Sequence, residues 1–177
     1  MSNSLPTFAP LPSKTCAAMP GPPLSPEEVL QRYHAGPSTG VFTDGSCDPN
    51  PGRGGWGWVW VENGVIRGQG CGEVADTTNN RMELTGLIEA YQALPPDAKY
   101  DVHSDSQLCV KTINEWAAGW EKRGWKRKTG PVQNLDLVRR LYELAKARPG
   151  LRLKWIKAHD GSRWNEYVDA SATNSIP

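Results

Sequence analysis

Residues 56–73 read WGWVWVENGVIRGQGCGE, and their pattern sets the architecture of a sheet. Within residues 56–62 the tryptophans alternate with glycine and valine, so the tryptophans share one face, as in a β-strand. The dipeptide Asn63-Gly64 is typical of a tight hairpin turn, because both residues tolerate a positive φ. We therefore expect residues 65–73 to return antiparallel to the tryptophan-containing strand.

Upstream of this hairpin, residues 41–44 form a short apolar run that ends in an acid and predicts another strand. Residues 45–55 are rich in glycine and proline and predict a turn between the two segments. Together the three strands form an antiparallel meander.

Downstream, helical and strand patterns alternate. Pro95-Pro96 ends the first helical pattern, because proline lacks the N–H and its ring clashes with the preceding turn. The predicted elements are helices over 80–94, 107–120, 135–147 and 165–173 and strands over 100–105 and 151–157. A meander followed by β-α units predicts an α/β fold with a mixed five-stranded sheet, an antiparallel meander plus two parallel strands, flanked by helices.

The chain has 177 residues, enough for one domain with an appendage. Eight of the 15 prolines lie in residues 1–37, where charged residues are few. Such a segment buries little apolar surface to offset its ordering entropy, so we expect residues 1–38 to be a Pro-rich mobile extension. Within it, Ser25 and Pro26 suit the start of a short helix. Residues 39–177 form the domain.

Composition limits the possible partners. No apolar run approaches the ~20 residues of a membrane span, so we expect no membrane contact. The formal net charge of +1 excludes a uniformly basic nucleic-acid binder, so nucleic acid would be met by a local patch. The N-terminus lacks a basic segment followed by an apolar one, and the four cysteines form no C-x-x-C pair. We expect a cytoplasmic monomer.

Three acids interrupt apolar patterns. Asp44 and Asp105 each end a predicted strand, and Glu83 borders the buried stripe of the helix over 80–94. If the two strands are parallel neighbours, these carboxylates meet at the edge of the sheet where α/β folds bind ligands. Clustered carboxylates repel unless hard cations such as Mg²⁺ lie between them. The pattern suggests metal-assisted phosphoryl chemistry, with scattered helix-start and turn acids as the alternative.

Residues 40–173 resemble type 1 ribonuclease H, the enzymes that cut the RNA strand of an RNA–DNA hybrid. The resemblance rests on five motifs in family order: TDGSCDPNPG at 43–52, TTNNRMEL at 77–84, SDSQ at 104–107, the tryptophan and lysine run at 116–126, and WIKAHDG at 155–161 followed by NEYVD at 165–169. It implies a ribonuclease H-like sheet, a catalytic domain at 39–177, and endonucleolytic hydrolysis that leaves 5′-phosphate and 3′-hydroxyl ends. The implied cofactor is Mg²⁺, two ions during catalysis, or Mn²⁺.

The resemblance also implies roles for single residues. Four acids match the family's metal-binding carboxylates: Asp44, Glu83, Asp105 and Asp169. His159 matches a histidine on a mobile loop that assists proton transfer or product release. The helix that carries Asp169 is short and poor in large apolar residues, so we expect Asp169 to be held less firmly than the other three.

The implied hybrid-binding residues fall into three groups. Residues 116–128 interleave three tryptophans with five lysines and arginines and resemble the family's basic protrusion, which grips the DNA strand. Its contacts would come from Trp116, Lys122, Arg123 and Lys126. Residues near the minor groove are Cys47, through its backbone, with Asn50, Asn79, Asn80 and Gln107. Thr78 and Asn134 resemble the DNA-phosphate pocket.

Simpler explanations exist for these residues, namely turn chemistry for the asparagines and an ordinary packed, solvated helix pair for residues 116–128. Asp76 stands where many relatives have an arginine, which predicts weaker phosphate capture or compensation by Arg81. Asn134 is also the expected cap of the helix over 135–147.

Two other functions stay open. The protein could be a hybrid-binding module without turnover, or a strand-transfer relative of the transposase and integrase type. The complete set of four carboxylates favours an enzyme over a binding module, because a binding module needs no metal site. The TTNNRMEL motif and the basic protrusion are not typical of strand-transfer proteins.

Overall fold

The structure, a computed structural model, describes residues 24–174. In chain order the elements are α1 (Pro26–Arg32), β1 (Gly40–Cys47), β2 (Gly52–Glu62), β3 (Val65–Thr77), α2 (Asn79–Ala93), β4 (Tyr100–Ser104), α3 (Gln107–Lys111), the π-helix η1 (Thr112–Trp116), α4 (Ala117–Lys122), β5 (Lys126–Arg127), β6 (Gly130–Pro131), α5 (Leu135–Ala147), β7 (Leu151–Trp155) and α6 (Arg163–Asn174).

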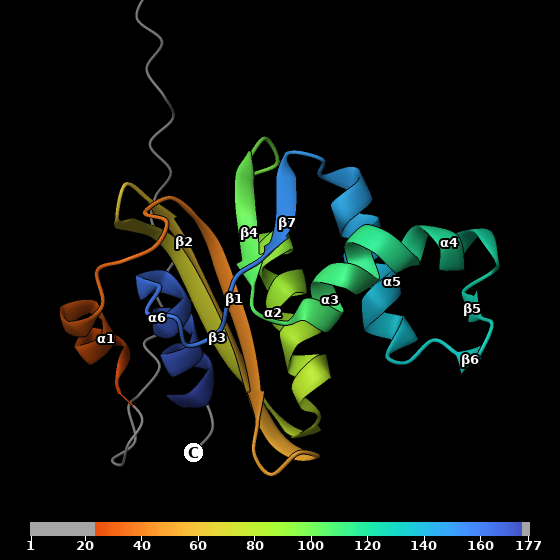
Figure 1. The fold of residues 1–177 in the computed structure, drawn as a ribbon, viewed down its shortest axis with the longest axis horizontal. Helices are drawn as coiled ribbons and strands as arrows, with labels where there is room; N and C mark the ends of the chain where they lie inside the picture. Colours follow the sequence, from red (N-terminus) through yellow and green to blue (C-terminus); the bar gives the residue numbers. More distant parts are fainter. Residues whose placement is uncertain (1–23, 175–177) are drawn as a thin grey trace, which may run out of the picture.

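Five strands form the main sheet in the order β3-β2-β1-β4-β7 (Figure 1). β1 pairs antiparallel with β2 and parallel with β4, and β4 pairs parallel with β7. The predicted mixed sheet, a meander extended by two parallel strands, is confirmed. β1 lies at its centre, so a side chain near the end of β1 can meet residues from both halves of the chain.

The meander strands are longer than predicted. β1 continues to Cys47, whose partner on β2 is Gly54, so the turn expected over residues 45–55 shrinks to residues 48–51. Glycine has a low strand propensity, which is why residues 45–55 predicted a turn. The pairing of two neighbouring strands outweighs that propensity here.

The predicted helix over 107–120 is divided into α3, η1 and α4. A short ribbon of β5 and β6 then follows inside the basic segment, with Arg127 paired to Gly130. Strands of two residues leave no periodic signal, so sequence patterns do not predict them. In Figure 1 this part of the chain projects from the side of the domain.

Helices cover both faces of the sheet. α2, α3 and α5 lie on one face, and α1 and α6 lie on the other (Figure 1). Neighbouring residues of β1 alternate between the two cores: Val41 packs with Trp58 on the first face, and Phe42 packs with Val59 on the second. The tryptophans and the valines of β2 lie on opposite faces of the sheet, as predicted.

The described part of the N-terminal segment packs on the domain. α1 begins with a capping box between Ser25 and Glu28, as Ser25 and Pro26 predicted. Val29 is 2% exposed and lies in one core with residues of α6 and β1. For residues 24–36 the expectation of a mobile extension is therefore wrong, because a few apolar side chains at helical spacing suffice to dock a short helix. Residues 1–23 lie outside the described residues.

Among the described helices, none combines the length and the apolar character that crossing a membrane requires.

Candidate active site

Three of the predicted acids meet at one edge of the sheet. The parallel pairing of β1 with β4 ends at Thr43 and Ser104, so Asp44 and Asp105 follow in register directly after it. Glu83 reaches the same place from the first turns of α2. Each of the three offers a carboxylate oxygen, and these oxygens lie within 4.8 Å of one another. The predicted meeting of Asp44, Glu83 and Asp105 is confirmed.

A glycine allows this close approach. α2 starts at Thr78, whose side-chain oxygen accepts a hydrogen bond from the Arg81 N–H at 3.4 Å. Its first turns pass directly over Gly45 of β1, where a Cβ atom would overlap the backbone of Met82 and Glu83. The absent side chain at Gly45 lets α2 bring Glu83 beside Asp44.

Burial shapes the chemistry of the two innermost acids. Asp44 and Glu83 are each 5% exposed. Burial raises the pKa of Asp44 well above its ordinary value, and the charges of Glu83, Asp105 and Asp169 raise it further. Burial likewise raises the pKa of Glu83, with the charges of Asp105 and Asp169 adding to the shift. A positive charge between the two carboxylates would oppose these shifts and favour their ionised forms.

Asp105 is held from two sides. The indole N–H of Trp155, at the end of β7, donates a hydrogen bond of 3.1 Å to the backbone carbonyl of Asp105. The carboxylate hydrogen-bonds with Asn165 of α6, a side chain that is 2% exposed. Burial and the charge of Asp169 raise the pKa of Asp105, whereas the bond from Asn165 lowers it.

The cluster fits a hard divalent cation. Oε2 of Glu83 is buried and has no hydrogen-bond partner, although an unpaired buried carboxylate oxygen is costly. Its neighbours at the site are other carboxylate oxygens, the ligand type that Mg²⁺ prefers. Asp44, Glu83 and Asp105 can hold such an ion, with Asp169 on the adjoining helix.

Asp169 and His159 complete the group. Asp169 lies on α6, and its charge helps to raise the pKa of Asp44. Nδ1 of His159 lies 3.8 Å from a carboxylate oxygen of Asp169 and 3.9 Å from one of Glu166, while its side chain is 75% exposed. The structure thus brings the four predicted carboxylates and His159 together, with His159 on the solvent side.

Two residues of this site were not predicted. Asn165 bonds to Asp105, and Glu166 faces His159 and accepts a hydrogen bond of 3.2 Å from the Gly161 N–H. Both lie one turn before Asp169 on α6, three and four residues away, and therefore on the same side of the helix. That spacing was the signal that could have identified them.

The predicted minor-groove residues lie around the start of α2. Oδ1 of Asn50 accepts a hydrogen bond of 3.2 Å from the backbone N–H of Asn79, which joins the loop after β1 to the helix. Cys47 is buried below this loop, and its sulfur lies 3.3 Å from the Pro49 carbonyl oxygen. Asn80 and Gln107 are exposed.

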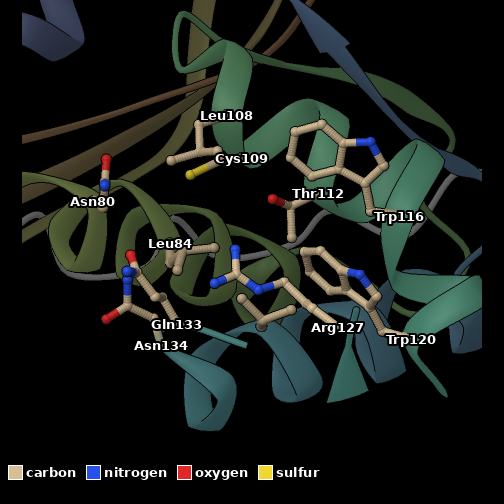
Figure 2. A pocket seen from close by; sticks show the side chains of 11 residues that line it. Asn80, Leu84, Leu108, Cys109, Thr112, Trp116, Trp120, Arg127, Gln133 and Asn134 are labelled. Carbon is tan, nitrogen blue, oxygen red and sulfur yellow. The ribbon is translucent and has the colours of Figure 1, made fainter. Parts of the chain in front are cut away.

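A pocket of about 100 Å³ lies between residues of α2, α3, η1 and α5 (Figure 2). Figure 2 shows Trp116 and Trp120 at one side of it, with the Arg127 side chain extending across it toward Leu84. Cys109 lines the pocket, and its pKa is raised to about 12, mainly by burial and further by the charges of Glu83 and Asp105. The pocket and the carboxylate cluster are therefore neighbours.

Asn134 begins α5 as predicted, but its side chain makes no capping bond because the residue is left-handed, with φ at 53°. Its side-chain oxygen instead accepts a bond of 3.4 Å from Arg81, which also forms two bonds to Asp136. Arg81 is thus already engaged with α5, and its guanidinium is not free to replace the arginine absent at Asp76.

Within the predicted protrusion, Lys122, Arg123 and Lys126 are exposed. Trp116 is 38% exposed, while Trp120 packs against the core around α2. Their rings lie 5.9 Å apart. The structure therefore separates a more exposed Trp116 from a more buried Trp120.

The chain matches known proteins over this region. The RNase H family model matches residues 37–176. A protein named Ribonuclease H from Methylorubrum extorquens is 49% identical over 134 residues, which cover 75% of this chain and 58% of that protein. A Ribonuclease H from Phenylobacterium zucineum is 43% identical over 141 residues, covering 79% of this chain and 91% of that protein. The crystal structure of LC9-RNase H1, a type 1 RNase H with the type 2 active-site motif, matches with a TM-score of 0.66 and 27% identity, covering 81% of this chain and 74% of that one.

Proposed function

The chain belongs to the RNase H family, and we propose that it is an endonuclease that hydrolyses the RNA strand of RNA–DNA hybrids and leaves 5′-phosphate and 3′-hydroxyl ends. The observation that carries the proposal is the convergence of Asp44, Glu83 and Asp105 at one sheet edge, with carboxylate oxygens within 4.8 Å of one another. A binding module gains nothing from this costly arrangement, so the cluster favours turnover.

We propose that Asp44, Glu83, Asp105 and Asp169 hold two Mg²⁺ ions during catalysis, with Mn²⁺ as a substitute. The orphaned Oε2 of Glu83 and the raised pKa values of Asp44 and Glu83 support a cation at this place. When bound, two such ions activate the attacking water and stabilise the leaving oxygen.

The surrounding residues orient the Asp105 carboxylate and exchange protons. Asn165 fixes the Asp105 carboxylate through its hydrogen bond. His159 stands at the open side of the site, with its Nδ1 3.8 Å from Asp169, so proton exchange between the two would pass through a water molecule. Its exposure supports a role in proton transfer or product release.

Hybrid binding is assigned to three groups of residues. The amides at the start of α2 and Gln107 supply donors and acceptors for the RNA 2′-hydroxyl, which DNA lacks. Trp116, with the cations Lys122, Arg123 and Lys126, supplies a ring and positive charges for the DNA strand. Thr78 and Asn134 are assigned to a DNA phosphate. Arg127 supplies a cation in the adjoining pocket.

A single experiment tests the function. The purified protein is incubated with an RNA–DNA hybrid, duplex RNA and duplex DNA of the same sequence, with Mg²⁺ and with a chelator. Cleavage of the RNA strand of the hybrid alone, dependent on Mg²⁺, is expected. Hybrid binding without cleavage would identify a binding module, and joining of DNA ends would identify a strand-transfer enzyme.

The oligomeric state and the cellular location stay predictions. We propose that the protein acts as a monomer, which light scattering on the purified protein measures. The cytoplasmic location is tested by cell fractionation.

A further inference from the structure

The segment that leads from α1 into β1 runs beside the loop that carries His159. The backbone carbonyl of Ala35 accepts a hydrogen bond of 2.9 Å from the Arg163 N–H, and Ala35 and Ser162 form a parallel bridge. Tyr33 lies beside Gly161, 3.9 Å from the position that a Cβ would take there. The residues between α1 and β1 therefore follow residues 161–163 closely.

Gly161 and Ser162 directly precede α6. The carbonyl of Ser162 accepts a bond of 2.9 Å from the Glu166 N–H, and the Gly161 N–H donates to the Glu166 carboxylate at 3.2 Å. His159 comes just before this start, and Asp169 lies on α6 after it. A displacement of Ser162 therefore moves both His159 and the acids of α6.

Gly36 packs so closely against Ser162 that no side chain fits between them. Its φ is 90°, and a Cβ at this position would lie 2.5 Å from Oγ of Ser162. Ser162 is 8% exposed, and its Oγ has no hydrogen-bond partner. The contact between Gly36 and Ser162 is therefore steric. A substitution at Gly36 or Ser162 changes this packing without breaking a hydrogen bond of the Ser162 side chain.

α1 holds α6 on the outer side as well. Val29, Leu30 and Tyr33 pack with Trp164, Tyr167 and Val168 of α6 (α1 and α6 lie side by side in Figure 1). On its other side α6 approaches β2, where a Cβ at Gly57 would lie 3.3 Å from Val168. α6 thus packs between the sheet on one side and the N-terminal segment on the other.

We propose that residues 33–36, with α1 behind them, are a positioning element of the active site that fixes the start of α6 and thereby Asp169, Asn165 and His159. The inference rests on the proposed function. It explains how α6 keeps Asp169 in place: Trp164, Tyr167 and Val168 are buried, and the second side of the helix is covered by a segment from the other end of the described chain. Tyr33 and Gly36 act through Gly161 and Ser162 and are positioning residues, not catalytic ones.

The test compares two glycine substitutions. Gly36→Ala places a Cβ against Ser162, whereas Gly64→Ala, at φ 76° in the hairpin between β2 and β3, meets nothing within 4 Å. Both carry the same kind of backbone strain, but only the first pushes on α6. For Gly36→Ala we expect kcat on a short hybrid to fall about 10- to 100-fold, the loss that misplacement of catalytic groups produces. KM should change little, because the proposed hybrid contacts lie on other elements.

A second readout does not depend on activity. The Mg²⁺ concentration that gives half of the Mg²⁺-induced rise in Tm should increase about tenfold for Gly36→Ala, because a supporting residue that shifts a ligand weakens metal binding. Gly64→Ala should match the wild type in both kcat and Mg²⁺ midpoint. Measurements are made well below the Tm of the least stable variant.

A rescue experiment distinguishes a positioning effect of Gly36→Ala from a general loss of stability. Ser162→Ala removes the unpartnered Oγ, the atom that a Cβ at Gly36 would meet most closely, while Cβ and Cα of Ser162, at 3.1 and 3.2 Å, stay in place. The double variant Gly36→Ala/Ser162→Ala should therefore regain part of the kcat and of the Mg²⁺ midpoint, while Ser162→Ala alone should stay near the wild type. Unchanged kcat and Mg²⁺ midpoint in Gly36→Ala, equal losses in Gly64→Ala, or failure of the double variant to recover would overturn the proposal. A wild-type protein that does not cut the hybrid would instead refute the proposed function.

Discussion

The backbone of Glu83 packs directly on Gly45, with no space for a side chain between them. This contact sets the distance from α2 to β1 and thereby the distance from Glu83 to Asp44. Gly45→Ala should therefore lower the Tm and the activity together. Overpacking of this kind costs roughly 1–3 kcal/mol, and each kcal/mol is worth about 2–4 °C for a chain of this size.

The matched control is Gly68→Ala on β3, where a Cβ would find its nearest neighbour at 3.4 Å, an ordinary contact with Trp58. Thermal unfolding and hybrid cleavage of both variants check the prediction. If Gly45→Ala proves as stable and as active as Gly68→Ala, α2 has room to move and Gly45 does not set the geometry.

Asp105→Asn should abolish cleavage and leave the fold intact, because an amide lacks the negative charge proposed to hold the metal ions. We expect a loss greater than about 100-fold, the upper effect of changing a residue that only supports a ligand. Asp101→Asn is the control, since Asp101 lies on β4, the strand that Asp105 follows, but pairs with Arg152 and Lys154 at the surface. Mg²⁺-dependent activity near the wild-type rate in Asp105→Asn would refute the metal assignment.

Asp44→Asn should raise the Tm of the metal-free protein at pH 7 while eliminating activity. The pKa of Asp44 is raised above its ordinary value of 3.8, so its ionised form destabilises the folded state. The stability that the protonated Asp44 contributes to the folded wild type is therefore fully present below pH ~4 and is lost as the pH rises through the raised folded pKa. The variant cannot ionise and escapes this loss.

The difference in Tm between Asp44→Asn and the wild type should thus be smallest in acid and grow toward neutral pH, by about 2–4 °C for each kcal/mol of repulsion removed. Calorimetry in a chelator at several pH values measures it. Saturating Mg²⁺ should shrink the difference, because a bound cation stabilises the ionised wild-type site. A variant less stable than the wild type at pH 7 without metal would contradict the prediction.

His159→Ala should slow turnover without eliminating it. The imidazole is 75% exposed, so water can replace it as a proton carrier. We expect kcat to fall by at most about 100-fold, the low end for a general acid or base, with KM nearly unchanged. Single-turnover and steady-state rates together measure the effect. A loss as complete as that of Asp105→Asn would assign His159 a larger role.

Neutralising Lys122, Arg123, Lys126, Arg127 and Lys128 together should raise KM more than it lowers kcat, because these cations lie on the protrusion and are proposed to contact phosphates. For each phosphate that the variant no longer neutralises, the slope of log K against log[salt] should flatten by roughly 0.7–0.9. KM at several ionic strengths measures the slope. Unchanged KM and slope would show that the segment is an ordinary solvated surface.

The sequence predicts the fold and the innermost acids for a simple physical reason. An acid that directly follows an apolar strand cannot be explained by packing, and the β-α order makes the strands of Asp44 and Asp105 parallel neighbours. Helix α5 was predicted with its observed bounds, Leu135–Ala147, because its apolar residues recur at helical spacing and Pro149-Gly150 follows it.

Other features depend on distance in space and leave little local signal. α1 has the composition of an unstructured segment, and only the tertiary contacts of Val29 and Tyr33 dock it on α6. The role of Asn165 depends on the approach of α6 to Asp105, which no local pattern along the chain reveals. The engagement of Arg81 by Asp136, 55 residues away, is equally invisible along the chain.

The contact between α1 and α6 joins the first and last described elements, so it has a consequence for synthesis. The ribosome releases α1 before every other described element, and its partner α6 emerges after all of them. Until then Val29, Leu30 and Tyr33 lack the α6 side chains that cover them. A nascent chain therefore carries an uncovered apolar segment and a site without Asp169 until α6 has been synthesised.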